Sequence, residues 1–228
     1  MLLIDLLFPK FCLGCSHIGS YICHRCFKKL KVINKPTCLY CHKQSYLGLT
    51  HPKCLKKLSI DGVLSIYYYD NLLKKIIKNI KYRLATIVWD EFWKSIPESD
   101  ISRLFAYKKI FCEAFIQVVP LSQSKYQSRG FNQAMMIAKY FKKVLNFPII
   151  NILKRSHEAL AQAQIKLKKS RLKNVKNVFL ITRRVDIKNK TIILIDDVIT
   201  TGATLKEACR VLKKAGANKV YALTLAKG

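Results

Sequence analysis

The feature that most constrains the fold of this chain is a series of cysteine pairs near its start. Seven of the nine cysteines lie before residue 55, and six of them form three Cys-x-x-Cys pairs. His51 and Cys54 form a fourth pair with the same spacing. A two-residue spacing presents both ligand atoms to one metal ion, and four pairs supply enough ligands for two closed tetrahedral zinc sites.

We assign the ligands to two structural Zn²⁺ ions in chain order. The first set is Cys12, Cys15, Cys23 and Cys26, and the second is Cys38, Cys41, His51 and Cys54. Sequence alone leaves an interleaved pairing open, and His24 or His42 could replace His51. The competing interpretation is a disulfide framework, which is typical of secreted chains. The N-terminus has no basic n-region and its apolar stretch is interrupted by Asp5 and Pro9, so we expect no secretory signal and a cytoplasmic protein.

The cysteine-rich segment is expected to form a domain of its own, residues 1–60. Few aliphatic residues lie between its cysteine pairs, so it cannot bury enough apolar surface to fold unaided. Zinc binding must supply the stability, roughly 10–16 kcal/mol per structural site in small peptides. Closed sites of this kind have no open position for water, which makes them structural rather than catalytic.

Residues 61–228 are expected to form an α/β domain with a mainly parallel sheet flanked by helices. Apolar residues recur at helical spacing in segments 72–80 and 133–145 and after residue 203, and they alternate with short β-branched or apolar runs at 116–119, 192–195 and 220–225. No apolar run reaches the roughly 18 residues that a membrane span requires. We therefore expect no transmembrane segment.

The stretch from residue 192 to residue 204 is the most informative about function. A buried strand leads into Asp196 and Asp197, then into a loop of Thr200, Thr201 and Gly202 and the helix start at Ala203 and Thr204. Ligands of open α/β sheets bind at the carboxyl ends of the strands. There the two carboxylates can accept hydrogen bonds from vicinal sugar hydroxyls, while the loop amides and the helix dipole favour an anion. Together these groups predict a site for a ribose 5-phosphate.

This order of residues resembles the signature of the type I phosphoribosyltransferases, whose ligand is phosphoribosyl pyrophosphate (PRPP) with Mg²⁺. A second segment, Val119-Pro-Leu-Ser122 followed by Arg129-Gly-Phe-Asn-Gln-Ala134, resembles the motifs of the ComF family of phosphoribosyltransferase-like competence proteins. Further likenesses cover nearly the whole chain. They are the cysteine pairs, Lys81-Tyr82-Arg83, Arg155, a glutamine at 162 or 164, Arg171, Asn174 and Phe179.

The resemblance implies roles for several residues. Asp196 and Asp197 would orient the ribose, and Thr200, Thr201, Gly202, Ala203 and Thr204 would hold the 5-phosphate. The turn of Pro120, Leu121 and Ser122 would face the pyrophosphate with backbone donors. Arg129 either makes a charge-assisted contact with the pyrophosphate or ties the loop to its helix. Ser122 stands where the family commonly has histidine, and Gln123 where a basic residue is usual.

The charge balance favours a polyanionic partner. Forty-two Lys and Arg face 13 Asp and Glu, a net charge of +29. Such a surface attracts nucleic acid through counterion release. A Lys-rich composition can also raise this count without making a binding site. The basic residues concentrate locally at Lys166, Lys168, Lys169, Arg171, Lys173 and Lys176.

The resulting hypothesis is a ComF-like protein that binds PRPP and Mg²⁺ and handles single-stranded DNA in natural competence, the uptake of DNA. Its other partners would be competence proteins such as a DNA helicase. The alternative is an active phosphoribosyltransferase that transfers ribose 5-phosphate to an unidentified acceptor. A PRPP-sensing transcriptional regulator is a weaker third hypothesis, since no helix-turn-helix is apparent in the sequence.

Overall fold

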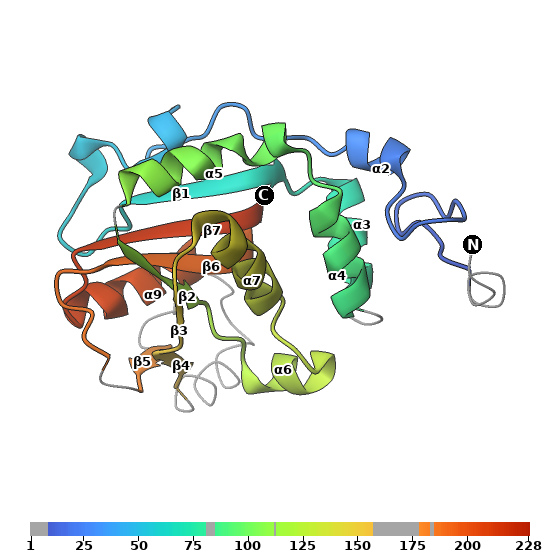
Figure 1. Cartoon of the computed structure of the whole chain (residues 1–228). Helices are drawn as coiled ribbons and strands as arrows, with labels where there is room; N and C mark the ends of the chain where they lie inside the picture. Colours follow the sequence, from blue (N-terminus) through green and yellow to red (C-terminus); the bar gives the residue numbers. More distant parts are fainter. Residues whose placement is uncertain (1–8, 81–84, 112, 157–177, 183–184) are drawn as a thin grey trace, which may run out of the picture.

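The computed structural model describes residues 9–80, 85–111, 113–156, 178–182 and 185–228 (Figure 1). Within these ranges five parallel strands form the central sheet, in the order β1-β7-β6-β2-β3. The strands are β1 Gly62–Tyr68, β2 Ala114–Val118, β3 Ile149–Ile150, β6 Thr191–Ile199 and β7 Lys219–Lys227. The expected α/β class with a parallel sheet is confirmed.

Helices cover the sheet, and the alternation of β6 shows why both faces need cover. Residues Ile192 to Ile195 are all fully buried, as expected of a parallel strand with helices on both sides. Ile193 and Ile195 pack into one apolar core, and Ile192 and Leu194 into the other. The helices of the first core are α3 Asn71–Ile80, α4 Ala85–Lys94, α5 Glu98–Ile110 and α7 Gln133–Leu145, and α9 Ala203–Lys214 belongs to the second.

Smaller elements complete the described part of the chain. A two-stranded antiparallel sheet lies beside the central sheet, and a short helix leads into α7 (Figure 1). The cysteine-rich segment carries only short helical turns. These elements are β4 Leu153–Arg155, β5 Phe179–Ile181, α6 Gln123–Arg129, α2 His24–Lys28, and the 3₁₀ turns η1 Tyr46–Gly48 and η2 Pro52–Cys54.

The cysteine-rich segment contributes to both cores instead of folding around its own. Phe27 and Leu30 pack into the first core with α3 and α4, while Leu39 and Ile60 pack into the second with α9. The amides of Tyr21 and Ile22 also donate to Glu91 Oε1 on α4, at 2.7 Å and 3.2 Å. The expected domain boundary at residue 60 stays a prediction, because packing is continuous across it.

The junction itself is held by a buried carboxylate. Asp61 is 6% exposed, and its Oδ2 accepts the amide of Val220 at 2.8 Å. The ammonium group of Lys213 lies 2.8 Å from the same oxygen, with its side chain only 8% exposed. A buried carboxylate that binds both an amide and a cation holds its segment in one position relative to its neighbours. Any shift would leave a buried charge without its partner. Asp61 therefore fixes the end of the cysteine-rich segment against β7 and α9.

Two expectations about the strands differ from the structure. The expected strand at 192–195 is longer, because the backbone pairing of β6 with β7 continues through Asp196 and Ile199, opposite Thr224 and Lys227. The expected strand at 116–119 begins earlier, at Ala114, and ends one residue sooner. The acidic pair consequently lies within the last half of a strand instead of directly after one.

Several expectations fall outside the described ranges: Lys81-Tyr82-Arg83, the glutamine at 162 or 164, Asn174 and the basic cluster of residues 166–176. Within the described ranges, no helix has both the length and the apolar composition needed to cross a bilayer.

Candidate functional site

The structure gathers the eight predicted metal ligands into two groups. One group is Cys12, Cys15, Cys23 and Cys26, and the other is Cys38, Cys41, His51 and Cys54; within each, the ligand atoms all lie within 4.8 Å of one another. The groups follow chain order, and among the described residues neither His24 nor His42 joins one. The grouping agrees with the predicted assignment, while metal ligation by these residues remains a prediction.

The donor set and spacing fit zinc. Tetrahedral coordination at a Zn–S distance near 2.3 Å places sulfurs roughly 3.8 Å apart, and the sulfurs of Cys15 and Cys23 are 3.6 Å apart. In the second group His51 Nδ1 lies 3.2 Å from Cys41 Sγ, and Nε2 lies 3.1 Å from the carbonyl oxygen of Gln44. If Nε2–H donates to that carbonyl, the lone pair of Nδ1 is left for the metal, as is usual for metal-bound histidines.

The acidic pair lies beside the turn that follows β2. Because β2 and β6 are parallel neighbours, Val118 stands opposite Ile195, and the amide of Val119 donates to the carbonyl of Ile195 at 2.9 Å. Val119 and Pro120 directly follow β2, and Asp196 is the next residue of β6. Parallel pairing thus brings the predicted pyrophosphate turn and the predicted ribose carboxylates to the same edge of the sheet.

Backbone donors orient both carboxylates. Oδ1 of Asp196 accepts the amide of Asp197 at 2.9 Å, and Oδ1 of Asp197 accepts the amide of Val198 at 2.8 Å. Burial, and after it the neighbouring charge of Asp197, raise the pKa of Asp196 to about 8 against the opposing effect of Arg155. A buried carboxyl group with a raised pKa is typical of a binding site. There a cationic or hydroxyl-bearing ligand can stabilise the ionised form of the carboxyl group.

Arg155 is a site residue that the predicted ligand set omits. Its Nε donates to the carbonyl of Pro120 at 3.0 Å, and its guanidinium lies 5.3 Å from the centre of the Phe179 ring. Burial lowers the pKa of Arg155, whereas the charge of Asp196 raises it. Arg155 therefore connects β4 to the pyrophosphate turn and brings a cation near the acidic pair. Its place in the family motif was the only sequence signal for this position.

The loop of residues 200–204, which is predicted to hold the 5-phosphate, leads into α9 through a glycine cap. Gly202 has φ +72°, a left-handed conformation that favours glycine, and it is the N-cap of α9. Its carbonyl accepts the amide of Lys206 at 2.8 Å, and Thr201 Oγ1 accepts the amide of Ala203 at 3.4 Å. The twelve-residue helix α9 begins at the end of this loop. The partial positive charge at its N-terminus would favour an anion there, as the amide donors of the loop would.

Residues 129–134 mainly shape the chain around the turn. Nη1 of Arg129 donates to Gln133 Oε1 at 3.0 Å, which ties α6 to α7 and supports the structural alternative for this arginine. Asn132 accepts the amide of Ala134 and donates to the carbonyl of Val119, at 3.0 Å and 3.1 Å. Ser122 is buried, with its hydroxyl 3.3 Å from that of Ser124. A pyrophosphate contact by Arg129 stays a prediction.

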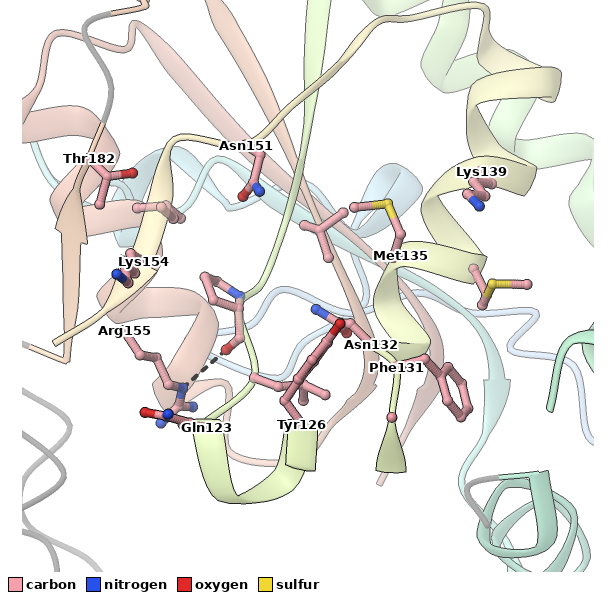
Figure 2. A pocket seen from close by; sticks show the side chains of 16 residues that line it. Gln123, Tyr126, Phe131, Asn132, Met135, Lys139, Asn151, Lys154, Arg155 and Thr182 are labelled. Atoms are coloured by element: carbon pink, nitrogen blue, oxygen red, sulfur yellow. Dashed lines mark hydrogen bonds between the residues drawn. The ribbon is translucent and has the colours of Figure 1, made fainter. Parts of the chain in front are cut away.

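An open cavity of about 820 Å³ adjoins the pyrophosphate turn. Figure 2 shows Arg155 and Lys154 on one side of it, Met135 and Lys139 on the other, and the bond from Arg155 to the Pro120 carbonyl. Tyr126 and Phe131 also line it. Its volume lies within the usual range for small-molecule sites. No local sequence pattern predicted this cavity, because its walls come from segments that are separate in the chain.

Comparison with known proteins identifies two domains. The phosphoribosyl transferase domain model matches residues 127–228, and the double zinc ribbon domain model matches residues 3–55. Competence protein F of Haemophilus influenzae is 30% identical over 95% of this chain and 95% of its own length. Competence protein ComFC of Bacillus subtilis is 30% identical over 90% of this chain and 83% of its own. The DNA utilization protein YhgH of Escherichia coli is 28% identical over 48% and 47% of the two chains.

We predict that the purified protein holds two zinc ions and that His51→Ala weakens the retention of one. The variant leaves the second group with three thiolates, so a chelator concentration that spares the wild type should remove one ion. His24→Ala and His42→Ala are matched controls that should keep both ions. Metal analysis by mass spectrometry gives the counts. Fewer than two ions in the wild type, or loss of an ion in His42→Ala, would contradict the assignment.

We also predict that Asp196→Asn stabilises the ligand-free protein at high pH. Because the folded pKa of Asp196, about 8, exceeds its ordinary value near 4, the folded state binds more protons between these values, and stability falls as pH rises. The variant has no carboxyl group to titrate, so its free energy of unfolding should exceed that of the wild type at pH 8.5.

Urea denaturation across pH 4–9 measures this difference, which should vanish at pH 4. Asp90→Asn is the control, since Asp90 is exposed and pairs with Lys94 at the surface. A gain for Asp196→Asn that is equal at both ends of the pH range would show that titration is not its cause.

Proposed function

This chain belongs to the family of competence proteins F and ComFC, and from that membership we propose that it binds PRPP with Mg²⁺ and handles single-stranded DNA in natural competence. Binding of PRPP belongs to the phosphoribosyl transferase domain. Handling of DNA belongs to the basic surface.

One observation carries the PRPP proposal: the acidic pair, the pyrophosphate turn and the 200–204 loop converge where β2 and β6 end. In this arrangement the carboxylates of Asp196 and Asp197 accept the two ribose hydroxyls. The amides of the 200–204 loop bind the 5-phosphate, and the turn after β2 with Arg155 lies toward the pyrophosphate. Each group of the ligand thereby meets donors or acceptors of the matching kind.

The acidic side chains and the pyrophosphate oxygens are hard oxygen ligands of the type that Mg²⁺ prefers. When bound, the ion would neutralise charge on the pyrophosphate. Asp196 and Asp197 are the side chains placed to hold it together with the ribose hydroxyls. Burial raises the pKa of Asp196, and a bound Mg²⁺ would lower it again, because a nearby cation favours the ionised carboxyl that the site needs.

The DNA part of the proposal rests on charge and on the relatives. A net charge of +29 supports binding to a polyanion, and similar proteins are named for competence and DNA utilization. The predicted basic cluster lies outside the described residues. Among the described ones, Lys139 and Lys154 line the cavity together with Tyr126, a combination of cations and aromatic surface that suits single strands.

Catalytic transfer is the second candidate function, and the cavity is the observation that favours it. An acceptor nucleophile would attack C1 of the ribose, the bond from C1 to the pyrophosphate oxygen would break, and pyrophosphate would leave with the bonding electrons. The cavity beside the turn offers apolar surface from Met135 and Phe131, and amides from Asn132 and Asn151, for an acceptor ring. A turnover assay with labelled PRPP over a panel of bases and oligonucleotides separates transfer from binding alone.

We predict Mg²⁺-dependent PRPP binding that falls at least tenfold in Asp196→Asn/Asp197→Asn. Removing two charges should raise nonspecific attraction to phosphate, so a loss of affinity reports ribose recognition, at about 1.5–3 kcal/mol per hydrogen bond to a charged group. Titration calorimetry with and without Mg²⁺ measures it. Asp186→Asn is the matched control, since this carboxylate accepts only a local amide, that of Lys188, in the described structure. Unchanged affinity in the double variant would refute the assignment.

We further predict binding to single-stranded DNA without marked sequence preference. Binding at low salt alone does not distinguish a defined site from diffuse charge. The measured quantity is therefore the slope of log K against log salt, which becomes more negative by roughly 0.7 for each phosphate neutralised. If there is a local site, the slope should become less steep when Lys166, Lys168, Lys169 and Lys173 are changed to Ala. The control variant changes four exposed lysines elsewhere: Lys28, Lys29, Lys108 and Lys109. Equal losses in both variants would show a diffuse charge without a defined site.

A further inference from the structure

The second zinc group is joined to the 200–204 loop by the short hairpin that carries two of its ligands. We call residues 37–44 the second knuckle; its ends pair at Thr37 and Gln44, and the amide of Cys38 donates to the carbonyl of Lys43 at 2.9 Å. Between its two cysteines the knuckle holds Leu39 and Tyr40. The Leu39 side chain contacts Gly202, and the Tyr40 ring lies near Lys206 while its hydroxyl accepts the amide of Ile60 at 3.1 Å.

Leu39 packs directly on Gly202. It is only 4% exposed and belongs to the core on the α9 side of the sheet, with Ile199 and Leu205. A methyl group placed on the α-carbon of Gly202 would lie 2.9 Å and 3.2 Å from the two methyl carbons of Leu39. Gly202 is therefore needed for the approach of the knuckle as well as for its own backbone conformation.

Two lysines extend the same contact. Nζ of Lys206, on the first turn of α9, lies 5.0 Å from the centre of the Tyr40 ring and 3.5 Å from the carbonyl oxygen of Thr201. Nζ of Lys227, opposite Ile199 in the sheet, donates to Thr37 Oγ1 at 2.6 Å. The second knuckle thus contacts the 200–204 loop through Leu39. It also contacts Lys206, which follows the loop, and Lys227, which pairs with the strand before the loop.

The interface is closed. The cavity left between the knuckle and the sheet holds only about 10 Å³ and is lined by Leu39, Ile199 and Lys227 among others. That volume is near the minimum for a single water molecule. A closely packed interface transmits a change of shape from one side to the other, since there is no space in which either side can relax.

From these contacts we propose that the second zinc site positions the phosphate-binding loop through Leu39, so that binding of zinc and binding of a ribose 5-phosphate ligand are thermodynamically coupled. The proposal rests on the proposed PRPP function. The knuckle has no helix or strand of its own, and its shape depends on two sulfurs sharing one ion. Zinc fixes Leu39, Leu39 limits the positions open to Gly202, and a phosphate held by the 200–204 amides favours that same position.

Coupling of this kind is reciprocal, so either ligand must strengthen the binding of the other by the same factor. The first zinc site supplies an internal reference. Its knuckle packs elsewhere: Gly14 lies against Leu72 of α3, and the carbonyl of Gly14 accepts Nζ of Lys75. A phosphate ligand should therefore protect one zinc ion and leave the other unaffected.

The test measures zinc transfer from the full chain to a chromogenic chelator, with and without Mg²⁺-PRPP. In the wild type we expect PRPP to strengthen the equilibrium binding of one of the two ions about tenfold in competition with the chelator, within the usual range for coupled sites. Calorimetry on the same sample measures PRPP binding itself. Absence of PRPP binding would overturn the proposed function together with the coupling. Binding of PRPP with unchanged affinity for both ions would overturn the coupling alone.

Variants then test Leu39 as the positioning residue. Leu39→Ala should keep both zinc ions, bind PRPP more weakly and lose the protection, and Leu39→Met should restore both properties. Leu30→Ala is the matched control: Leu30 is 6% exposed, also lies in the ribbon, and packs into the other core. If Leu30→Ala weakened PRPP binding as much as Leu39→Ala, general loss of stability would explain the effect and the positioning role would be wrong.

Discussion

Parallel pairing of β6 with β2 and β7 is the interaction on which the rest of the structure depends. It places the carboxyl ends of three strands at one edge of the sheet, and the candidate PRPP site consists of the turn after β2, the acidic pair in the last half of β6 and the loop after β6. The strand must be buried on both faces to hold this position, which its four fully buried residues from Ile192 to Ile195 achieve. Helices α3, α4, α5 and α7 cover one face and α9 covers the other, and the zinc ribbon adds side chains to both cores.

The zinc ribbon is therefore part of the cover of the sheet as well as a metal-binding segment. Its first half packs with α3 and α4, and its second half reaches the loop that is expected to hold phosphate. Leu39, for example, would expose its apolar side chain to solvent if the ribbon stood alone. If zinc holds the ribbon as proposed, it also holds this surface against the second domain, which would give a physical reason for finding the two domains in one chain.

Local patterns in the sequence predicted the parts of the molecule that local chemistry determines. The Cys-x-x-Cys spacing gave both metal groups, and the run from Ile192 to Thr204 gave the central strand, the acidic pair and the loop. The sequence did not predict contacts between distant segments. The contact of Leu39 with Gly202 and the position of Arg155 near Asp196 both depend on how the whole chain packs. The end of β6 was misjudged for the same reason, since β7 continues to pair with it beyond two acidic residues that would otherwise favour a turn.

The central claim is that the residues after β2 and β6 form one PRPP site whose phosphate loop rests on the zinc knuckle. A crystal structure of the zinc-loaded protein with Mg²⁺-PRPP tests it most directly. The account predicts the 5-phosphate on the amides of residues 200–204, the ribose hydroxyls at Asp196 and Asp197, and Leu39 against Gly202. Density for the ligand in the cavity beside Lys139 and Lys154, with the 200–204 loop empty, would contradict it.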